Sequence, residues 1–284
     1  MGAETTPMKI ILLLAGALSL AHGFDSQGRE TIRKTFPAAA RIEVDDVDGR
    51  IRVTGYNGNE IRMIAEKTIR ADSEDRLDAA KREVTLDMRE SGNTLTLYVD
   101  GPFRCHCGDG GRGIHDDGRH GYTVTYDFEL QVPAATLLRL ATVNHGEIQI
   151  ENTTGDFDLS NVNAGIEMRN VAGSGRAHTV NGRISASFVR NPVKESSFKT
   201  VNGSIEATFQ ANLSADMRLK TFNGDAYTDF DSTPLPRVTP VAERQDGKFV
   251  YRADRSTSLR IGNGGPALAF DTLNGNIRII KRGQ

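Results

Sequence analysis

Residues 179–188 read TVNGRISASF, residues 200–209 read TVNGSIEATF, and residues 221–230 read TFNGDAYTDF. Asn-Gly between two alternating runs is the usual signal of a β-hairpin. A hairpin, however, gives no reason for the same segment to return every 21 residues. A period of about 20 residues is typical of a solenoid, in which one structural unit stacks on copies of itself.

The same turn, an apolar residue followed by Asn and then Gly, recurs along the second half of the chain. Its leading residues are Val143, Val162, Val180, Val201, Phe222 and Leu273, with steps of 19, 18, 21, 21 and 51 residues, and one extra residue precedes the Gly in the first two copies. The clearest corners are predicted at Asn181-Gly182, Asn202-Gly203, Asn223-Gly224 and Asn274-Gly275. The long last step leaves room for one degenerate unit and the Pro-rich loop 231–247.

The side-chain pattern favours a solenoid over a meander of hairpins. After each Gly, one face repeats small or apolar residues, namely Ile184, Ala186 and Phe188, then Ile205, Ala207 and Phe209, then Ala226, Thr228 and Phe230. The opposite face is polar and differs between copies. A meander does not require residue i to match residue i+21, whereas in a stacked coil the two lie about 4.8 Å apart. We therefore expect an all-β fold with a parallel β-helix-like solenoid over 134–284.

A strand-rich module is predicted over 24–133, where it caps one end of the solenoid. Apolar residues alternate at strand spacing in 38–70, with turns at Asp48-Gly49 and Asn57-Gly58. The period then changes over 73–84. Ser73 is a good N-cap, and acidic residues at the start and basic residues at the end of this segment suit a helix over 74–83.

The N-terminus has the layout of a secretory signal over 1–23. Lys9 precedes the apolar run IILLLAGALSLA (10–21), and Ala21 and Gly23 are the small residues of a cleavage site. The run is shorter than the roughly 20 residues that a membrane-spanning helix needs. The alternative is a buried N-terminal helix. We expect an exported protein of the periplasm, cell surface or medium, with no transmembrane segment after cleavage.

The charge composition narrows the range of expected binding partners. The chain has 284 residues, 25% of them charged, and a formal net charge of −2. This balance gives no electrostatic case for a nucleic acid or an anionic membrane as partner. An unknown protein or a glycan of the cell envelope is the expected partner.

The Gly-rich loop 101–121 holds candidate metal ligands. It contains both cysteines, Cys105 and Cys107, together with His106, His115 and His120. Thiolate and imidazole are preferred ligands of zinc and copper. Cys-x-Cys is not the usual zinc-knuckle spacing, and outside the cytoplasm two cysteines more often form a disulfide. The alternatives are a loop with no dedicated role, a metal site, and pairing with another chain or redox work. We expect no resident cofactor.

No constellation meets the requirements of an enzyme. Asp156 and Asp158 lie on one side of a predicted strand, like the paired carboxylates of glycoside hydrolysis, but alternating Asp is also the ordinary solvent face of a strand. No serine has a nucleophile-elbow motif or a positioned His partner. We therefore expect a non-enzymatic protein, with a polysaccharide-acting enzyme as a remote alternative.

These repeats carry a resemblance. Six T-V/F-N-G-x-I-type units after a strand-rich segment with one helix resemble the bacterial putative-adhesin family, over roughly 38–284. The resemblance implies an exported β-solenoid with a role in adhesion or envelope stress, and it carries over no catalytic residues. An adhesin-like binding or scaffold protein is thus the leading hypothesis. A periplasmic metal-binding or redox protein using Cys105, Cys107 and the neighbouring histidines is the second.

Overall fold

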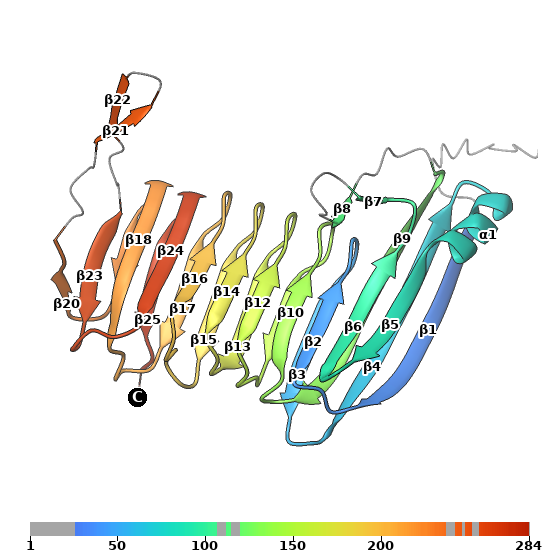
Figure 1. Cartoon of the computed structure of the whole chain (residues 1–284), viewed down its shortest axis with the longest axis horizontal. Helices are drawn as coiled ribbons and strands as arrows, with labels where there is room; N and C mark the ends of the chain where they lie inside the picture. Colours follow the sequence, from blue (N-terminus) through green and yellow to red (C-terminus); the bar gives the residue numbers. More distant parts are fainter. Residues whose placement is uncertain are drawn as a thin grey trace, which may run out of the picture.

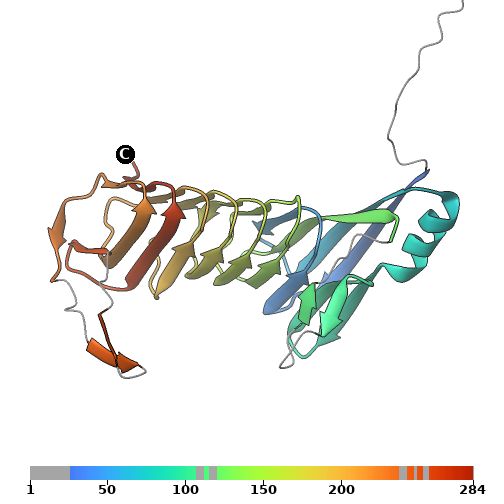
Figure 2. The ribbon, with the colours of Figure 1, turned by 90° about the horizontal axis from the view of Figure 1, so that it is seen from above.

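The computed structural model describes residues 26–106, 112–114, 120–236, 242–245, 248–251 and 256–283. Within these ranges the chain is almost entirely β-strand with a single helix, and most strands belong to two large mixed sheets. The body is elongated, and the sheets run along it (Figures 1 and 2). The predicted all-β class with one helix is confirmed. The signal sequence predicted over 1–23 lies outside the described residues.

The first sheet has ten strands. In spatial order they are β1 (Ser26–Pro37), β4 (Glu60–Ala71), β9 (Tyr122–Pro133), β3 (Ile51–Tyr56), β11 (Ile148–Glu151), β13 (Ile166–Val171), β15 (Ile184–Phe188), β17 (Ile205–Phe209), β25 (Ile277–Lys281) and β19 (Ala226–Thr228). From β9 to β19 every neighbouring pair is parallel. Only β1, β4 and β9 pair antiparallel.

The second sheet has eleven strands. In spatial order they are β20 (Ser232–Pro234), β23 (Thr257–Ile261), β18 (Ala215–Asn223), β24 (Ala267–Asn274), β16 (Ser196–Lys199), β14 (Gly175–His178), β12 (Phe157–Ser160), β10 (Leu137–Ala141), β2 (Arg41–Asp45), β6 (Thr94–Asp100) and β5 (Thr85–Ser91). From β18 to β6 every neighbouring pair is parallel, and the strands outside that range pair antiparallel.

In the middle of the body, successive coils each give one strand to each sheet in the predicted register. Ile148 lies opposite Ile166, Ile166 opposite Ile184, and Ile184 opposite Ile205. All four side chains are buried in one core shared by the two sheets. Phenylalanines fill the same core further along. Phe188 stacks on Phe209 with ring centroids 4.9 Å apart, and Phe198 stacks on Phe270 at 5.0 Å.

The order of the last coils corrects one sequence-based expectation. The 21-residue spacing predicts that the coil at Asn223 stacks directly on the coil at Asn202. Instead, β24 and β25 lie between them, and β16–β17 contact this C-terminal coil rather than β18–β19. The three coils share one motif, so the local pattern does not fix their order. Ala226, expected in the interior, is exposed because β19 is the edge strand of the first sheet.

Each residue of the T-V-N-G motif has a separate structural role. The buried Thr200 hydroxyl donates to the carbonyl oxygen of Gly182 in the preceding coil. The Asn202 side-chain amide donates to Asn181 Oδ1 at 2.8 Å, so the asparagines form a hydrogen-bonded ladder. A Cβ on Gly203 would lie 2.0 Å from the Gly182 carbonyl oxygen, so only glycine permits this close stacking. The turn signal in the sequence is therefore also a stacking signal.

The N-terminal module confirms the predicted helix. α1 (Glu74–Glu83) begins at the N-cap Ser73, whose side chain accepts from the backbone N–H of Arg76, and it buries Leu77 and Ala80. The turn between β2 and β3 includes Asp48, which forms a β-bridge to Asn144 of the repeats. No helix in the described ranges is long and apolar enough to cross a membrane.

The two predicted loops contain short strands. β7 (Arg104–His106) pairs with β8 (Arg112–Ile114) within 101–121. β20 and β21 (Ala242–Gln245) lie within the predicted Pro-rich loop 231–247, and β21 pairs with β22 (Lys248–Tyr251) directly after it.

Candidate functional site

A groove of about 450 Å³ crosses the outer face of the second sheet. Its lining comes from β2, β10, β12, β14 and the turn before β16. We call it the charged groove, and it comprises Arg41, Leu137, Arg139, Asp156, Phe157, Asp158, Ser174, Gly175, Arg176, Lys194 and Glu195. Apolar and backbone atoms from Leu137, Phe157 and Gly175 separate charged side chains of both signs.

Parallel register brings opposite charges together across the groove. Glu43 of β2 lies beside Arg139 of β10, Arg139 beside Asp158 of β12, and Asp158 beside Arg176 of β14. Neighbouring parallel strands are about 4.8 Å apart, so signs alternate at that interval. Arg176 Nη2 lies 2.8 Å from Asp158 Oδ2. The row therefore supports the strand register as well as lining the groove.

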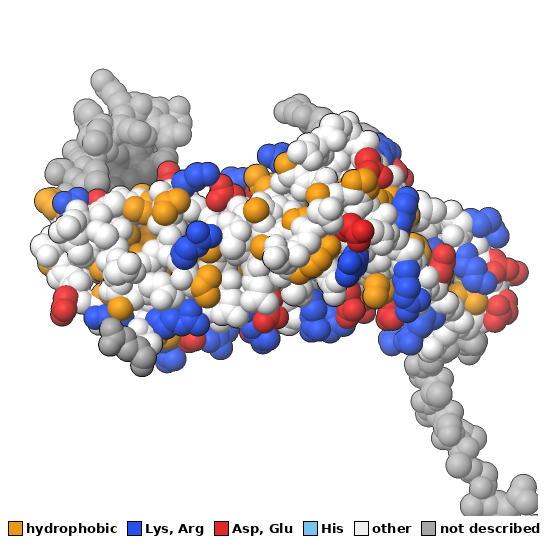
Figure 3. Space-filling model, turned by 90° about the horizontal axis from the view of Figure 1, so that it is seen from below, with side chains coloured by type: hydrophobic (Ala, Val, Ile, Leu, Met, Phe, Trp, Pro, Cys, Tyr) orange, Lys and Arg blue, Asp and Glu red, His pale blue; other side chains and the backbone are white. Residues whose placement is uncertain are grey.

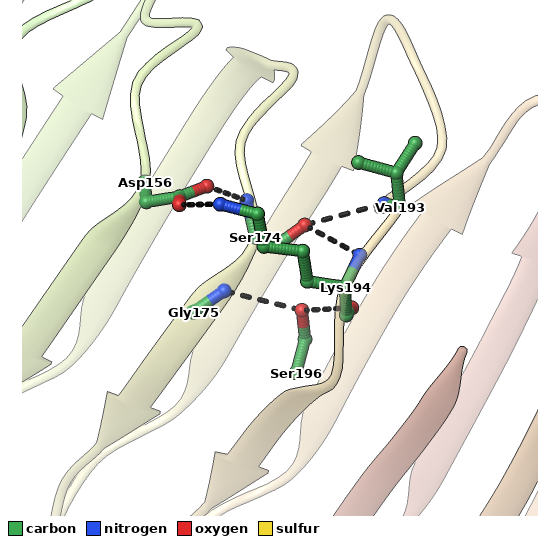
Figure 4. A network of polar contacts seen from close by, with 6 residues as sticks. All are labelled: Asp156, Ser174, Gly175, Val193, Lys194 and Ser196. Atoms are coloured by element: carbon green, nitrogen blue, oxygen red, sulfur yellow. Dashed lines mark hydrogen bonds and ion pairs between the residues drawn. The ribbon is translucent and has the colours of Figure 1, made fainter.

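Asp156 is held by a polar network at the edge of the groove (Figure 4). Its carboxylate accepts from the Ser174 backbone N–H at 3.0 Å and from Lys194 Nζ at 2.7 Å. Ser174 Oγ in turn accepts from the backbone N–H groups of Val193 and Lys194, both at 3.2 Å. Side chains and backbone thus fix the turn before β16 against the turns of the two preceding coils.

This network affects the charge state of Asp156. Partial burial alone would raise the pKa of its carboxyl, but the hydrogen bonds from Lys194 and the Ser174 backbone outweigh burial and lower the pKa. A glycosidase general acid needs a raised pKa. Asp158 is meanwhile paired with Arg176. Asp156 and Asp158 therefore serve as ion-pair partners of Lys194 and Arg176, and Asp156 is poorly suited to donating a proton.

The basic side chains of the charged groove differ in how closely they are paired with carboxylates. Lys194 and Arg176 each have a close carboxylate partner. Arg41 and Arg139, in contrast, share the single carboxylate of Glu43, at the longer distances of 3.5 and 3.9 Å. The Arg139 side chain is 63% exposed. This end of the groove presents two guanidinium groups that can reach an anionic group on a partner.

The described residues on the underside of the molecule also carry charges of both signs. In Figure 3, basic and acidic side chains alternate over this face, with apolar side chains scattered between them. Surface ion pairs of this kind contribute little to stability individually.

The candidate metal ligands of loop 101–121 are only partly described. Cys105 lies in β7 and is disulfide-bonded, and His106 is the last residue of β7. The His120 ring lies 5.6 Å from the ring of Tyr122. Cys107 and His115 lie outside the described residues. Within the described ranges, no three His, Cys, Asp or Glu side chains are grouped to hold a metal ion. A disulfide sulfur is not a thiolate ligand, so a metal site in this loop requires Cys105 in its reduced form, and the metal hypothesis stays a prediction.

Two serines and a histidine of the repeats take structural contacts. Ser187 Oγ accepts from the Asn170 backbone N–H, and Ser204 Oγ accepts from that of Asn276. His178 Nε2 lies 3.2 Å from Ser197 Oγ. Burial, with help from the nearby Arg176, lowers the pKa of His178.

Sequence reasoning missed the basic half of the charged groove. It named Asp156 and Asp158 but not Arg139, Arg176 or Lys194. The signal was the register of the coils: steps of 19 and 18 residues bring Arg139, Asp158 and Arg176 side by side, and Lys194 reaches Asp156 from two coils further along. Composition alone carries no such signal.

No family model matches the chain, and no curated protein matches its sequence. Several solved structures resemble it, among them the following three. A putative cell adhesion protein from Clostridium sporogenes is 8% identical with a TM-score of 0.44, covering 90% of this chain and 100% of that one. A putative adhesin from Bacteroides fragilis is 11% identical with a TM-score of 0.33, and the match covers 90% of this chain and 98% of that one. A putative lipid binding protein from Parabacteroides distasonis is 12% identical with a TM-score of 0.27, and the match covers 90% of this chain and 97% of that one. Such values assign no function.

Proposed function

We propose that this chain is an exported, non-enzymatic protein of the cell envelope, adhesin-like, that binds an acidic glycan through the charged groove. The stacked coils form a two-sheet solenoid that serves as a rigid scaffold for this surface. The sequence repeats resemble those of the putative-adhesin family. The apolar run at 10–21 supports export to the periplasm, the surface or the medium.

The charged groove is the observation that carries the proposal. Glycans are bound by shallow surfaces that combine apolar patches with planar, hydrogen-bonding side chains. The guanidinium groups of Arg41 and Arg139 supply paired donors for a carboxylate or sulfate. The lowered pKa of Asp156 and the ion pair of Asp158 favour binding over acid–base catalysis.

The test uses the mature chain 24–284 and a polyuronate as the acidic probe, with neutral dextran as its matched counterpart. We expect saturable binding to the polyuronate that weakens with added salt. Replacing both groove arginines, Arg41→Ser with Arg139→Ser, should weaken binding by about tenfold or more. Arg183→Ser, on the outer face beside the first sheet, is the control and should bind as the parent chain does.

Three results would contradict the proposal. Equal binding by the groove variant would place the site elsewhere. Binding to envelope proteins but to no glycan would change the class of partner. A fall in polyuronate viscosity that Asp158→Asn abolishes would make the protein an enzyme. A strain lacking the gene, tested for attachment and envelope-stress sensitivity, extends the test to the cell.

The metal-binding or redox alternative at Cys105, Cys107, His106, His115 and His120 has its own test. Elemental analysis of protein purified without chelator should find far less than one ion per chain, unchanged by Cys105→Ser. Stoichiometric zinc or copper lost in that variant would favour the alternative.

A further inference from the structure

The first sheet ends at β1, a strand of 12 residues whose outer edge is open. β1 pairs with β4 on one side, and no other strand among the described residues pairs with it. Figure 1 shows β1 as the last strand of the sheet at the N-terminal end of the body. An open edge of this length presents a row of main-chain donors and acceptors that can pair with another strand.

The hydrogen bonds inside the sheet fix which residues of β1 face the open edge. The Ala38 N–H donates to the Asn59 carbonyl oxygen, in continuation of the β1–β4 register. On the other side of β4, the Asp72 N–H donates to the Gly121 carbonyl oxygen, in continuation of the β4–β9 register. In an antiparallel sheet successive residues bond to opposite sides. Even-numbered residues of β1 therefore bond to β4, and the odd-numbered ones face the open edge, namely Gln27, Arg29, Thr31, Arg33, Thr35 and Pro37.

β1 also carries charges of the kind that protect an edge from pairing. Glu30 and Lys34 lie on the same face of β1 as the buried Phe36, and both are exposed. Inward-pointing charges are a common protection of edge strands. The Lys34 ammonium lies over the Phe36 ring, 4.9 Å from its centroid. Glu30 faces Lys67 of β4, but the Lys67 ammonium donates to the Val84 carbonyl oxygen at 2.5 Å. Both charges are thus available to a neighbouring strand.

A second copy of β1 matches both charges in one register. When two copies pair antiparallel about Ile32, Glu30 of each lies opposite Lys34 of the other. Odd-numbered residues then face odd-numbered residues, and about ten main-chain hydrogen bonds can form. Moving the axis by one residue places Arg33 opposite either Arg29 or its own copy. Moving it by two places Glu30 or Lys34 opposite its own copy. The register about Ile32 therefore pairs opposite charges where its neighbours oppose like charges.

We propose that two copies of the chain associate through β1, paired antiparallel about a two-fold axis at Ile32. The first sheet then continues from one molecule into the other. A two-fold axis uses the same surface on both copies, which is the commonest arrangement of homodimers. Because one strand from each copy forms the contact, we expect a weak dimer, with a Kd on the order of 10 μM or weaker.

Sedimentation of the mature chain 24–284 tests the association. The mass should rise from that of a monomer at about 1 μM toward that of a dimer at about 0.5 mM. Lys34→Glu places carboxylates opposite each other on both sides of the axis and should raise the Kd by about tenfold or more. Arg33→Glu is the matched control. It makes the same change in charge one residue away, but it faces Thr31 of the second copy, so the dimer should remain.

A cysteine at the axis detects the register directly. Ile32 would face its own copy in a non-hydrogen-bonded pair, where Cα atoms are about 4.5 Å apart, and a disulfide spans about 4.4–6.8 Å. Ile32→Cys, in a background of Cys105→Ser and Cys107→Ser, should therefore form a linked dimer when the concentrated protein is oxidised. Thr35→Cys is the control. It would lie opposite Arg29, about 20 Å from its own copy, and should stay unlinked.

Each outcome decides the proposal. A concentration-dependent dimer that Lys34→Glu weakens, together with selective linking of Ile32→Cys, supports it. A monomer at every concentration overturns it, even where β1 takes up a strand of another protein. A dimer that Lys34→Glu leaves unchanged uses another surface and overturns it as well.

The controls decide in the same way. Equal weakening by Arg33→Glu, or linking of Thr35→Cys instead of Ile32→Cys, overturns the register and the proposal with it. Thermal unfolding shows whether each variant folds. Should Ile32→Cys fail to fold, the comparison of Lys34→Glu with Arg33→Glu still decides. None of these results depends on glycan binding.

Discussion

Thr200 donates its hydroxyl hydrogen bond to the carbonyl oxygen of Gly182, 2.9 Å away in the preceding coil. The same bond joins Thr272 to Gly203 and Thr221 to Gly275. The threonine of one coil thus binds the glycine of the coil stacked before it. This relationship explains why the first and last letters of the motif recur together.

Thr200→Val should therefore destabilise the protein although the side-chain volume is kept. The change leaves the Gly182 carbonyl oxygen without this donor, and we expect a loss of about 1–2 kcal/mol in the free energy of unfolding. Chemical denaturation measures it. Thr208→Val, on the outer face of β17, is the matched control and should change stability little; equal losses would contradict a special role for Thr200.

Gly203→Ala should have a larger effect. Its Cβ would lie 2.0 Å from a backbone oxygen, and backbone cannot move aside without disturbing the stack. We expect a loss of about 3 kcal/mol or more. Gly92→Ala is the comparison, because Gly92 has a φ of 58° but no atom lies within 4 Å of the position that a Cβ would take. It should cost only about 1–2 kcal/mol. A cost at Gly203 no larger than that at Gly92 would contradict the requirement for close approach at Gly203.

Phe270→Ala tests whether the C-terminal coil, residues 267–281, supports the core. Phe270 is 1% exposed and stacks on Phe198. Removing the ring should leave a cavity and cost about 3–5 kcal/mol, measured by thermal and chemical unfolding. Val193→Ala, at a side chain 81% exposed, should fall within about 0.5 kcal/mol of the parent. A small effect at Phe270 would indicate that residues 267–281 dock loosely.

Asp46 should make stability depend on pH. Its side chain is 1% exposed, Oδ2 has no hydrogen-bond partner among the described residues, and burial raises the carboxyl pKa well above 3.8. The folded state thus binds this proton more tightly than the unfolded state. The stabilising contribution is full below pH 3.8 and is lost as pH rises through the raised folded pKa.

Asp46→Asn should remove the loss of stability that ionisation of Asp46 causes as the pH rises. The variant should exceed the parent in stability at neutral pH, by about 1 kcal/mol or more, and the difference should shrink as the pH falls toward 4. Urea denaturation across this pH range measures it. Asp231→Asn, at an exposed carboxylate, is the control and should show no such trend. A gap between Asp46→Asn and the parent that stays constant with pH would contradict the assignment.

The interior of the stack was predictable from the sequence because its ladders are local and repeated. The positions of Ile184, Ile205 and the helix 74–83 follow from spacing alone. The place of residues 267–281, between the coils of β16–β17 and β18–β19, was not predictable. Residues 200–209, 221–230 and 272–280 carry equivalent motifs, and the antiparallel pairing of β23 with β18, which covers the outer side of β18, is a long-range contact that no local pattern records.

The charged groove was half predictable for a related reason. Asp156 and Asp158 share one strand segment, so their common face is visible in the sequence. Arg139, Arg176 and Lys194 join them only through the register of neighbouring coils. Asp46 escaped notice because the sequence does not reveal that the residue after β2 occupies the buried position that Thr142 holds in the next coil.

The asparagine ladder also bears on the chemical lifetime of the protein. Asn-Gly is the dipeptide most prone to deamidation, because the glycine nitrogen can attack the neighbouring side-chain amide. Here that nitrogen is occupied: the Gly203 N–H donates to the Asn274 carbonyl oxygen, and the Gly275 N–H to that of Asn223. The amides of Asn202 and Asn274 are themselves tied to their neighbours. Stacking thus shields both of these ageing-prone sites, and a chain that has come unstacked would lose that chemical protection along with its shape.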